Sequence, residues 1–163
     1  MSAILLSSIL EQQYEEYKQL LALSKEKSQF ITANNIDSLN EVINKEAKNL
    51  LAIETLETKR IECVYALLSG HEWNGDVPTL SDCLKVVSEA EAKQLQKQQE
   101  QLSNAMNELR EINYLNQELI YQSLQFVTLS LSMVQPRQAP VNYGRDNKQI
   151  AKPIKQVYFD SQA

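Results

Sequence analysis

The chain contains few residues that interrupt helices. Among its 163 residues there are three glycines and four prolines, and none of them lies in residues 1–69 or 79–135. Glycine and proline are the residues that most disfavour a helix interior, so their absence from two such long stretches predicts an all-α protein. No glycine-rich loop and no P-loop sequence is present, which argues against a nucleotide site of that kind.

Residues that carry out chemistry are equally scarce. The chain has one histidine, His71, and two cysteines, Cys63 and Cys83. The spacing of the cysteines matches neither a metal motif nor a disulfide framework, so we expect both to be small buried side chains. Because no nucleophile is accompanied by a base, we expect no enzyme activity, no metal and no cofactor.

Long apolar runs are missing as well. No stretch approaches the roughly 20 apolar residues that a membrane-spanning helix needs. The opening sequence MSAILLSSILEQQ has no basic segment ahead of its apolar part, as a signal peptide would have. We therefore expect a cytoplasmic protein without membrane insertion.

Clustered basic residues are absent from most of the chain. The net charge is −5, and the residues from 136 onward carry five basic and two acidic side chains, so residues 1–135 carry −8. Nucleic-acid binding needs clustered Lys and Arg to neutralise phosphates, so nucleic acid is not expected as a partner.

Helical periodicity divides the chain into helices at residues 2–32, 37–69, 79–87 and 88–135. Residues 136–163 have scattered apolar residues only and are expected to form a flexible tail. We expect Asp37 to cap the second helix and Gly70 to end it. The predicted apolar stripe of that helix is Leu39, Ile43, Ala47, Leu50, Ile53, Val64, Leu67 and Leu68. The predicted fold is an elongated, antiparallel, coiled-coil-like three-helix bundle at residues 1–135.

The helix at 88–135 is longer than its partners. It spans roughly 70 Å, against about 50 Å for the helix at 37–69, so its end should extend beyond the bundle. That end carries two apolar stripes about 120° apart on a helical projection. The first stripe is Ile120, Leu124, Val127, Leu131 and Val134, and the second is Leu115, Leu119, Phe126 and Met133. Because packing on a bundle needs one stripe, we expect one to pack and the other to bind a helix of another protein.

Two asparagines interrupt the seam of this helix before the apolar end. Asn113 and Asn116 stand where apolar residues would be expected. A buried polar residue can fix the register of packed helices, and an exposed one can hydrogen-bond to a bound partner. Periodicity alone favours neither interpretation.

The same stretch resembles a known family. Leu109-Arg110, Asn113, Asn116, Leu119 and Ile120 precede the apolar helix end, and the string Pro136-x-Gln138-x-Pro140-x-x-Tyr143-Gly144-x-Asp146 follows it. This order of parts resembles the C-terminal signature of the FlgN family of flagellar type III export chaperones. The acidic N-terminal hairpin and the terminal Phe159-Asp160 are similar too.

The resemblance implies a cytosolic chaperone for hook-filament junction proteins. Such a chaperone binds their C-terminal amphipathic helices, prevents early assembly and delivers them to the export gate, without nucleotide or metal. Tyr143 would contact the export gate. The substrate contacts implied are Asn113, Asn116, Leu119, Ile120, Leu124, Val127, Leu131 and Val134.

Two other functions are compatible with the apolar end. A self-associating coiled-coil structural or adaptor protein would bury the spare stripe against its own copy, and a homodimer cut after Glu118 would then become a monomer. A helix lying on a membrane surface is the second alternative. Residues 119–134 contain no Lys or Arg, which makes this helix a poor match for anionic lipid.

Overall fold

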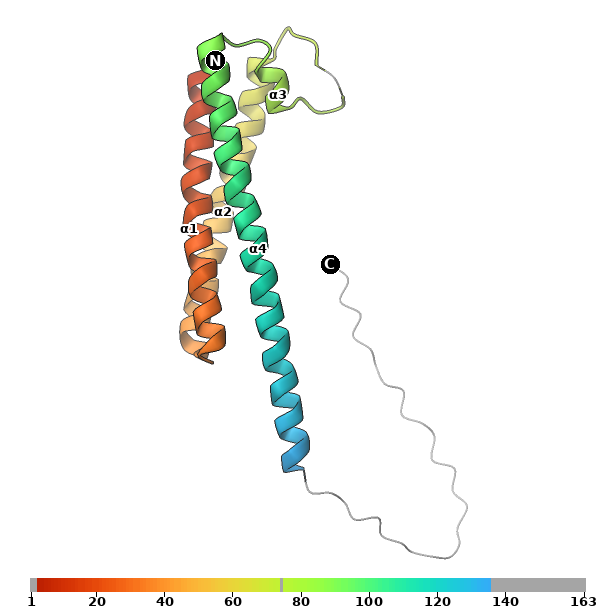
Figure 1. The fold of residues 1–163 in the computed structure, drawn as a ribbon. Helices are drawn as coiled ribbons and strands as arrows, with labels where there is room; N and C mark the ends of the chain where they lie inside the picture. Colours follow the sequence, from red (N-terminus) through yellow and green to blue (C-terminus); the bar gives the residue numbers. More distant parts are fainter. Residues whose placement is uncertain (1–2, 74, 136–163) are drawn as a thin grey trace, which may run out of the picture.

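The protein folds into three long helices and one short helix, as the computed structural model shows for residues 3–73 and 75–135 (Figure 1). The helices are α1 (Ala3–Thr32), α2 (Ile36–Leu67), α3 (Leu80–Cys83) and α4 (Glu89–Val134). No strand occurs in these described residues. The predicted all-α class, with a long helix at the C-terminal end of the bundle, is therefore confirmed.

Helix α1 lies between the other two long helices. It packs along both α2 and α4, whereas the backbones of α2 and α4 lie further apart and only some of their side chains meet in the core. The bundle is therefore open on the side where α2 and α4 face each other. This arrangement explains why the apolar face of α1 is broad in the sequence: it serves two neighbours at once.

Hydrogen bonds between side chains show the relative directions of the helices. Ser7 with Gln98, Ser24 with Asn113 and Ser28 with Asn116 join α1 to α4 at sequence separations of 91, 89 and 88 residues. A nearly constant separation means that α1 and α4 run parallel. Between α1 and α2 the separation falls from 44 for Gln13–Glu57 to 22 for Ser24–Glu46, so these helices are antiparallel.

The main apolar core lies at the end of the bundle where α1 and α4 begin. Its fully buried members are Leu6, Leu10, Val64, Leu68, Cys83 and Leu95. Helix α3 closes this end because Leu80 and Cys83 insert into the core. Cys63 belongs to the same cluster, and both cysteines are free thiols buried among apolar side chains, as expected.

The ends of α2 differ from the prediction. Asn35, not Asp37, is the N-cap: its side chain accepts a hydrogen bond from the Ser38 amide. Asn34 turns the chain with φ at 54°, a left-handed conformation that asparagine tolerates, and this brings Asn35 to the start of the helix. At the other end α2 stops at Leu67, and Gly70 lies in the following turn with φ at +85°.

The connection from α3 to α4 uses two capping boxes. Thr79 pairs with Asp82 at the start of α3, and Ser88 pairs with Glu91 at the start of α4. The second box starts α4 as a separate helix after the turns that follow α3. Helix α3 ends at Cys83 instead of Val87 because the Lys85 and Val86 amides donate to carbonyls three residues earlier, which tightens the chain into turns.

The first half of helix α2 also buries a different face from the predicted one, whereas Val64 and Leu68 at its C-terminal end are buried as predicted. Ile43 and Leu50 were expected in the core and are exposed, whereas Ile53 is buried as predicted. The physical reason is that α2 packs mainly on α1, and only its C-terminal end also packs on α3. The residues that α2 buries are Val42, Glu46, Asn49, Ile53, Leu56, Cys63 and Val64.

Toward the turn between α1 and α2, polar side chains replace the apolar core. The Asn116 side-chain amide donates to the Ser24 carbonyl at 2.9 Å, and its carbonyl oxygen accepts from the Ser28 hydroxyl. The Ser24 hydroxyl and Lys27 both bond to Glu46 of α2. This group of side chains therefore fastens α1 to both neighbours. With Asn116 only 2% exposed, the structure favours register fixing over partner contact for this residue.

We predict that Asn116→Ala destabilises the fold. Removing the amide leaves the Ser24 carbonyl and the Ser28 hydroxyl without these partners, which costs about 1–3 kcal/mol of unfolding free energy. Urea denaturation followed by circular dichroism measures this loss. Gln117→Ala is the matched control, because Gln117 is an exposed amide of the same helix and should change stability by less than about 0.5 kcal/mol. Equal effects of the two variants would contradict the register role.

We also predict an acid-sensitive cap at α3. The Asp82 carboxylate accepts hydrogen bonds from the Thr79 amide, the Thr79 hydroxyl and Lys85, which together lower its pKa from 3.8 to about 2. A folded-state pKa below the unfolded value gives stabilisation that is present above about pH 4 and is lost as the pH falls toward about 2.

The test compares unfolding free energies of the wild type and Asp82→Asn at several pH values. The wild type should be the more stable protein near neutral pH, and the difference should disappear by about pH 2. Asp76→Asn, in the exposed loop before α3, serves as the control, and its unfolding free energy should equal that of the wild type. A difference that stays constant with pH would exclude the carboxylate as the cause.

Candidate functional site

The end of α4 extends beyond the rest of the bundle. Ser28 pairs with Asn116, and α1 ends only four residues later at Thr32. Because the two helices run parallel with equal rise, α4 has no α1 beside it after about residue 120. Figure 1 shows this last part of α4, in blue, continuing past the turn that joins α1 to α2. The predicted extension is therefore present, and we call residues 119–134 of α4 the overhang.

Both apolar stripes of the overhang are uncovered. The members of the first stripe, from Ile120 to Val134, are 43% to 80% exposed. In the second stripe, Leu115, Phe126 and Met133 are also exposed, and only Leu119 is half-buried, near Ile31 at the hairpin turn. The expectation that the bundle covers one stripe is wrong, because α1 and α2 are too short to reach it.

The overhang carries no charge. Residues 119–134 contain no Asp, Glu, Lys or Arg. The hydroxyls of Ser123, Thr128 and Ser132 donate to carbonyls of their own helix, so they offer fewer hydrogen bonds to solvent. A contiguous, uncharged and apolar surface of this kind marks a site of protein interaction.

The other predicted site residues lie in different surroundings. Asn116 is buried against α1, whereas Asn113 is exposed and lines a shallow groove beside α4 with Tyr17 and Met106. Tyr143 and the tail at residues 136–163 lie outside the described residues. The structure thus groups the apolar residues from Leu119 to Val134 on one projecting helix and sets Asn116 apart from them.

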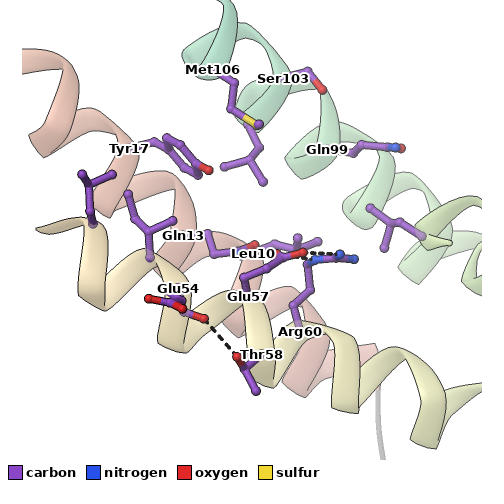
Figure 2. Close-up of a pocket in the computed structure, with 14 residues that line it drawn as sticks. Leu10, Gln13, Tyr17, Glu54, Glu57, Thr58, Arg60, Gln99, Ser103 and Met106 are labelled. Atoms are coloured by element: carbon purple, nitrogen blue, oxygen red, sulfur yellow. Dashed lines mark hydrogen bonds and ion pairs between the residues drawn. The ribbon is translucent and has the colours of Figure 1, made fainter. Parts of the chain in front are cut away.

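A larger groove opens between α2 and α4. It has a volume of about 590 Å³, with α1 as its floor and α2 and α4 as its walls (Figure 2). Leu10 and Tyr17 come from α1, and Met106 comes from α4. Leu50 and Ile53 of α2 also line it. The groove exists because α2 and α4 both pack on α1 and leave the space between them unfilled.

A polar cluster lies on the α2 side of this groove. Arg60 donates to both carboxylate oxygens of Glu57, at 2.8 and 2.7 Å, and the Gln13 amide donates to Glu57 at 2.9 Å (Figure 2). The Arg60 hydrogen bonds lower the pKa of Glu57, so the carboxylate stays ionised. Burial and the Glu57 charge raise the pKa of Tyr17. The cluster holds α2 to α1 and gives the groove a polar section.

Sequence reasoning did not find this groove. Leu50 and Ile53 were assigned to a closed core, because periodicity shows which face of a helix is apolar but not which neighbour covers that face. The only signal available was the pair Leu50-Leu51, which places two large apolar side chains on different faces of α2. Only the relative positions of α2 and α4 expose the groove.

The described residues contain neither a metal-binding group of His, Cys, Asp and Glu nor a helix long and apolar enough to cross a membrane. The site consists of an exposed apolar helix end and a groove. Such an arrangement can bind a helix of another protein.

Comparison with known proteins identifies the same family as the sequence motifs. Residues 1–150 match the family described as "FlgN protein". The chain is also 32% identical over 148 residues to "Uncharacterized protein YvyG" of Bacillus subtilis (strain 168), a match that covers 90% of each protein. No solved structure matches. With the family match extending over nearly the whole described fold, the chain belongs to the FlgN family of flagellar export chaperones.

Proposed function

We propose that this protein binds the C-terminal amphipathic helices of hook-filament junction proteins in the cytoplasm and delivers them to the flagellar type III export gate. The observation that carries the proposal is the overhang of α4, which exposes two apolar stripes without a single charged residue. Family membership supports the chaperone role.

An amphipathic helix is the natural ligand for this surface. The first stripe, from Ile120 to Val134, repeats at spacings of three and four residues, so the apolar stripe of a second helix can pack along it. Burial of about 600 Å² of apolar surface contributes on the order of 15 kcal/mol before the association and ordering terms, which offset most of it. The net affinity is then in the micromolar to nanomolar range.

Chaperone action follows from mass action. A junction protein whose C-terminal helix is bound to α4 cannot use that helix to assemble, and the bound fraction depends only on concentration and affinity. The absence of charge at the site means that affinity comes from apolar burial. Binding should therefore depend little on salt.

We predict that Leu124→Asp abolishes substrate binding without unfolding the protein. Leu124 is 61% exposed in the first stripe, so a carboxylate there is tolerated in the free protein but is buried against the apolar partner in the complex. We expect affinity for a junction-protein peptide to fall by more than about 100-fold, measured by calorimetry. Circular dichroism should show unchanged helicity.

The overhang offers a matched control in Leu129→Asp. Leu129 is 56% exposed on the opposite face of α4 from Ile120, so its substitution should leave the affinity within about threefold of the wild type. Loss of helicity in Leu124→Asp would instead mean that the stripe supports the fold. If the wild type binds no junction-protein peptide and a chain cut after Glu118 changes from dimer to monomer, the self-associating alternative holds.

We further propose that Tyr143 contacts the export gate. The proposal is supported by the resemblance of the string around Tyr143 to the family signature and by the family match, which includes this residue. Tyr143 also follows the proposed substrate-binding helix in the chain. Tyr143→Ala should keep substrate affinity within about twofold of the wild type while weakening binding to the cytoplasmic part of the export gate by about tenfold or more. Tyr143→Phe, which keeps the ring, separates the hydroxyl from the aromatic contribution. A large loss of substrate affinity would overturn this division of roles.

A further inference from the structure

We propose that the bound helix does not stop at the hairpin turn but continues along α4 into the groove between α2 and α4. The inference rests on the proposed function and extends its site. The overhang and the groove would then form one binding track, which runs from Gln99 to Val134 and takes a single amphipathic helix of the partner.

The first support is the periodicity of α4. Nine residues of α4 line the two sections of the groove, and six of them recur at alternating spacings of four and three: Gln99, Ser103, Met106, Arg110, Asn113 and Gln117. The other three, Leu102, Leu109 and Tyr114, lie beside this row. The same alternation continues without a break into the first stripe: Ile120, Leu124, Val127, Leu131 and Val134. The average spacing over this track is about 3.5 residues, the repeat along which a second helix coils around the first.

The second support is continuity in space. Tyr17 and Met106 line the groove between α2 and α4, and both also line the shallow groove that continues along α4 to Gln117. In Figure 2, Met106 of α4 lies next to Tyr17 of α1, at the junction of the two sections. The two grooves are therefore continuous along α4 from Gln99 to Gln117, and Ile120 of the first stripe follows three residues later.

The third support is the surface that such a helix would cover. Leu50 and Met106 are large apolar residues on opposite walls of the groove, and they are 52% and 40% exposed. A fourth helix between α2 and α4 would contact both, together with Tyr17 at the floor. It would complete a four-helix bundle from three helices that leave one side open.

The track also defines the chemistry of the occupant. Its outer half is uncharged and apolar. Its inner half presents the amides and hydroxyls of Gln99, Ser103, Asn113 and Gln117, and it also has charged side chains, those of Glu54, Glu57, Arg60 and Arg110. Gln13 also lines the inner half, and its buried Oε1 has no hydrogen-bond partner among the described residues. The partner helix should therefore be strongly apolar toward one end and carry Asn, Gln or Ser beside apolar anchors toward the other. At 1.5 Å per residue the track is about 50 Å long and fits a helix of roughly 35 residues.

Leu50 and Leu51 allow a sharp test. Both are exposed leucines of α2, at 52% and 64%, but only Leu50 lines the groove. The probes are synthetic peptides of the C-terminal helix of a junction protein: one of about 35 residues and its two halves, each long enough to cover only part of the track. Leu50→Asp should weaken binding of the long peptide by about tenfold or more and leave the half that binds the overhang unaffected. Leu51→Asp should change neither affinity.

A second readout does not depend on affinity. A photo-crosslinking residue, p-benzoylphenylalanine, is placed at position 50, 51 or 124 of the full chain. We expect crosslinks to the long peptide from positions 50 and 124, at peptide sites separated by several helical turns, and none from position 51.

The outcomes separate this inference from the proposed function. Loss of binding in Leu124→Asp with no effect of Leu50→Asp and no crosslink from position 50 would leave the chaperone function intact and overturn the extended track. If no peptide binds to the wild type, both the proposed chaperone function and the extended track are wrong. If Leu50→Asp changes the sedimentation of the free protein and not the peptide affinity, the groove belongs to a second copy of the chain, and the inference is wrong.

Discussion

The parallel pairing of α1 with α4 is the interaction on which the rest of the structure depends. Ser7–Gln98, Ser24–Asn113 and Ser28–Asn116 fix its register. Helix α1 has 30 residues and α4 has 46, so this register decides how much of α4 extends beyond the bundle. A shift of one helical turn would cover or expose the first residues of the apolar stripe. Stability and the extent of the exposed surface are therefore set by the same contacts.

The interior changes character along the bundle. At the end closed by α3, leucines and cysteines form a dry apolar core, while toward the hairpin turn Ser24, Glu46 and Asn116 take the central positions. Polar interiors specify register more than they add stability. The end of the bundle nearest the overhang is therefore held by specific hydrogen bonds, which fix the position of the overhang relative to α1.

Much of the fold could be predicted from the sequence, because long stretches without Gly or Pro and a clear 3.6-residue periodicity are local properties. The lengths of the three long helices followed directly, and the excess length of α4 followed from them. The wrong predictions concerned which side chains are buried and which residue caps a helix. Leu50 was assigned to the core because it shares an apolar stripe with Ile53, and Asp37 was assigned to the cap that Asn35 occupies. Periodicity identifies an apolar face, but the backbone turn at Asn34 and the identity of the neighbouring helix are needed to place it.

The sequence by itself therefore determined the helical class, the uncharged apolar end of α4 and the motif that indicates the FlgN family. Only the tertiary structure decided that both stripes are exposed, that Asn116 is buried while Asn113 is exposed, and that a groove separates α2 from α4. The physical reason is that burial depends on which surfaces meet. Because α1 contacts both neighbours and ends at Thr32, apolar residues of α2 and α4 that look equivalent in sequence differ in what covers them.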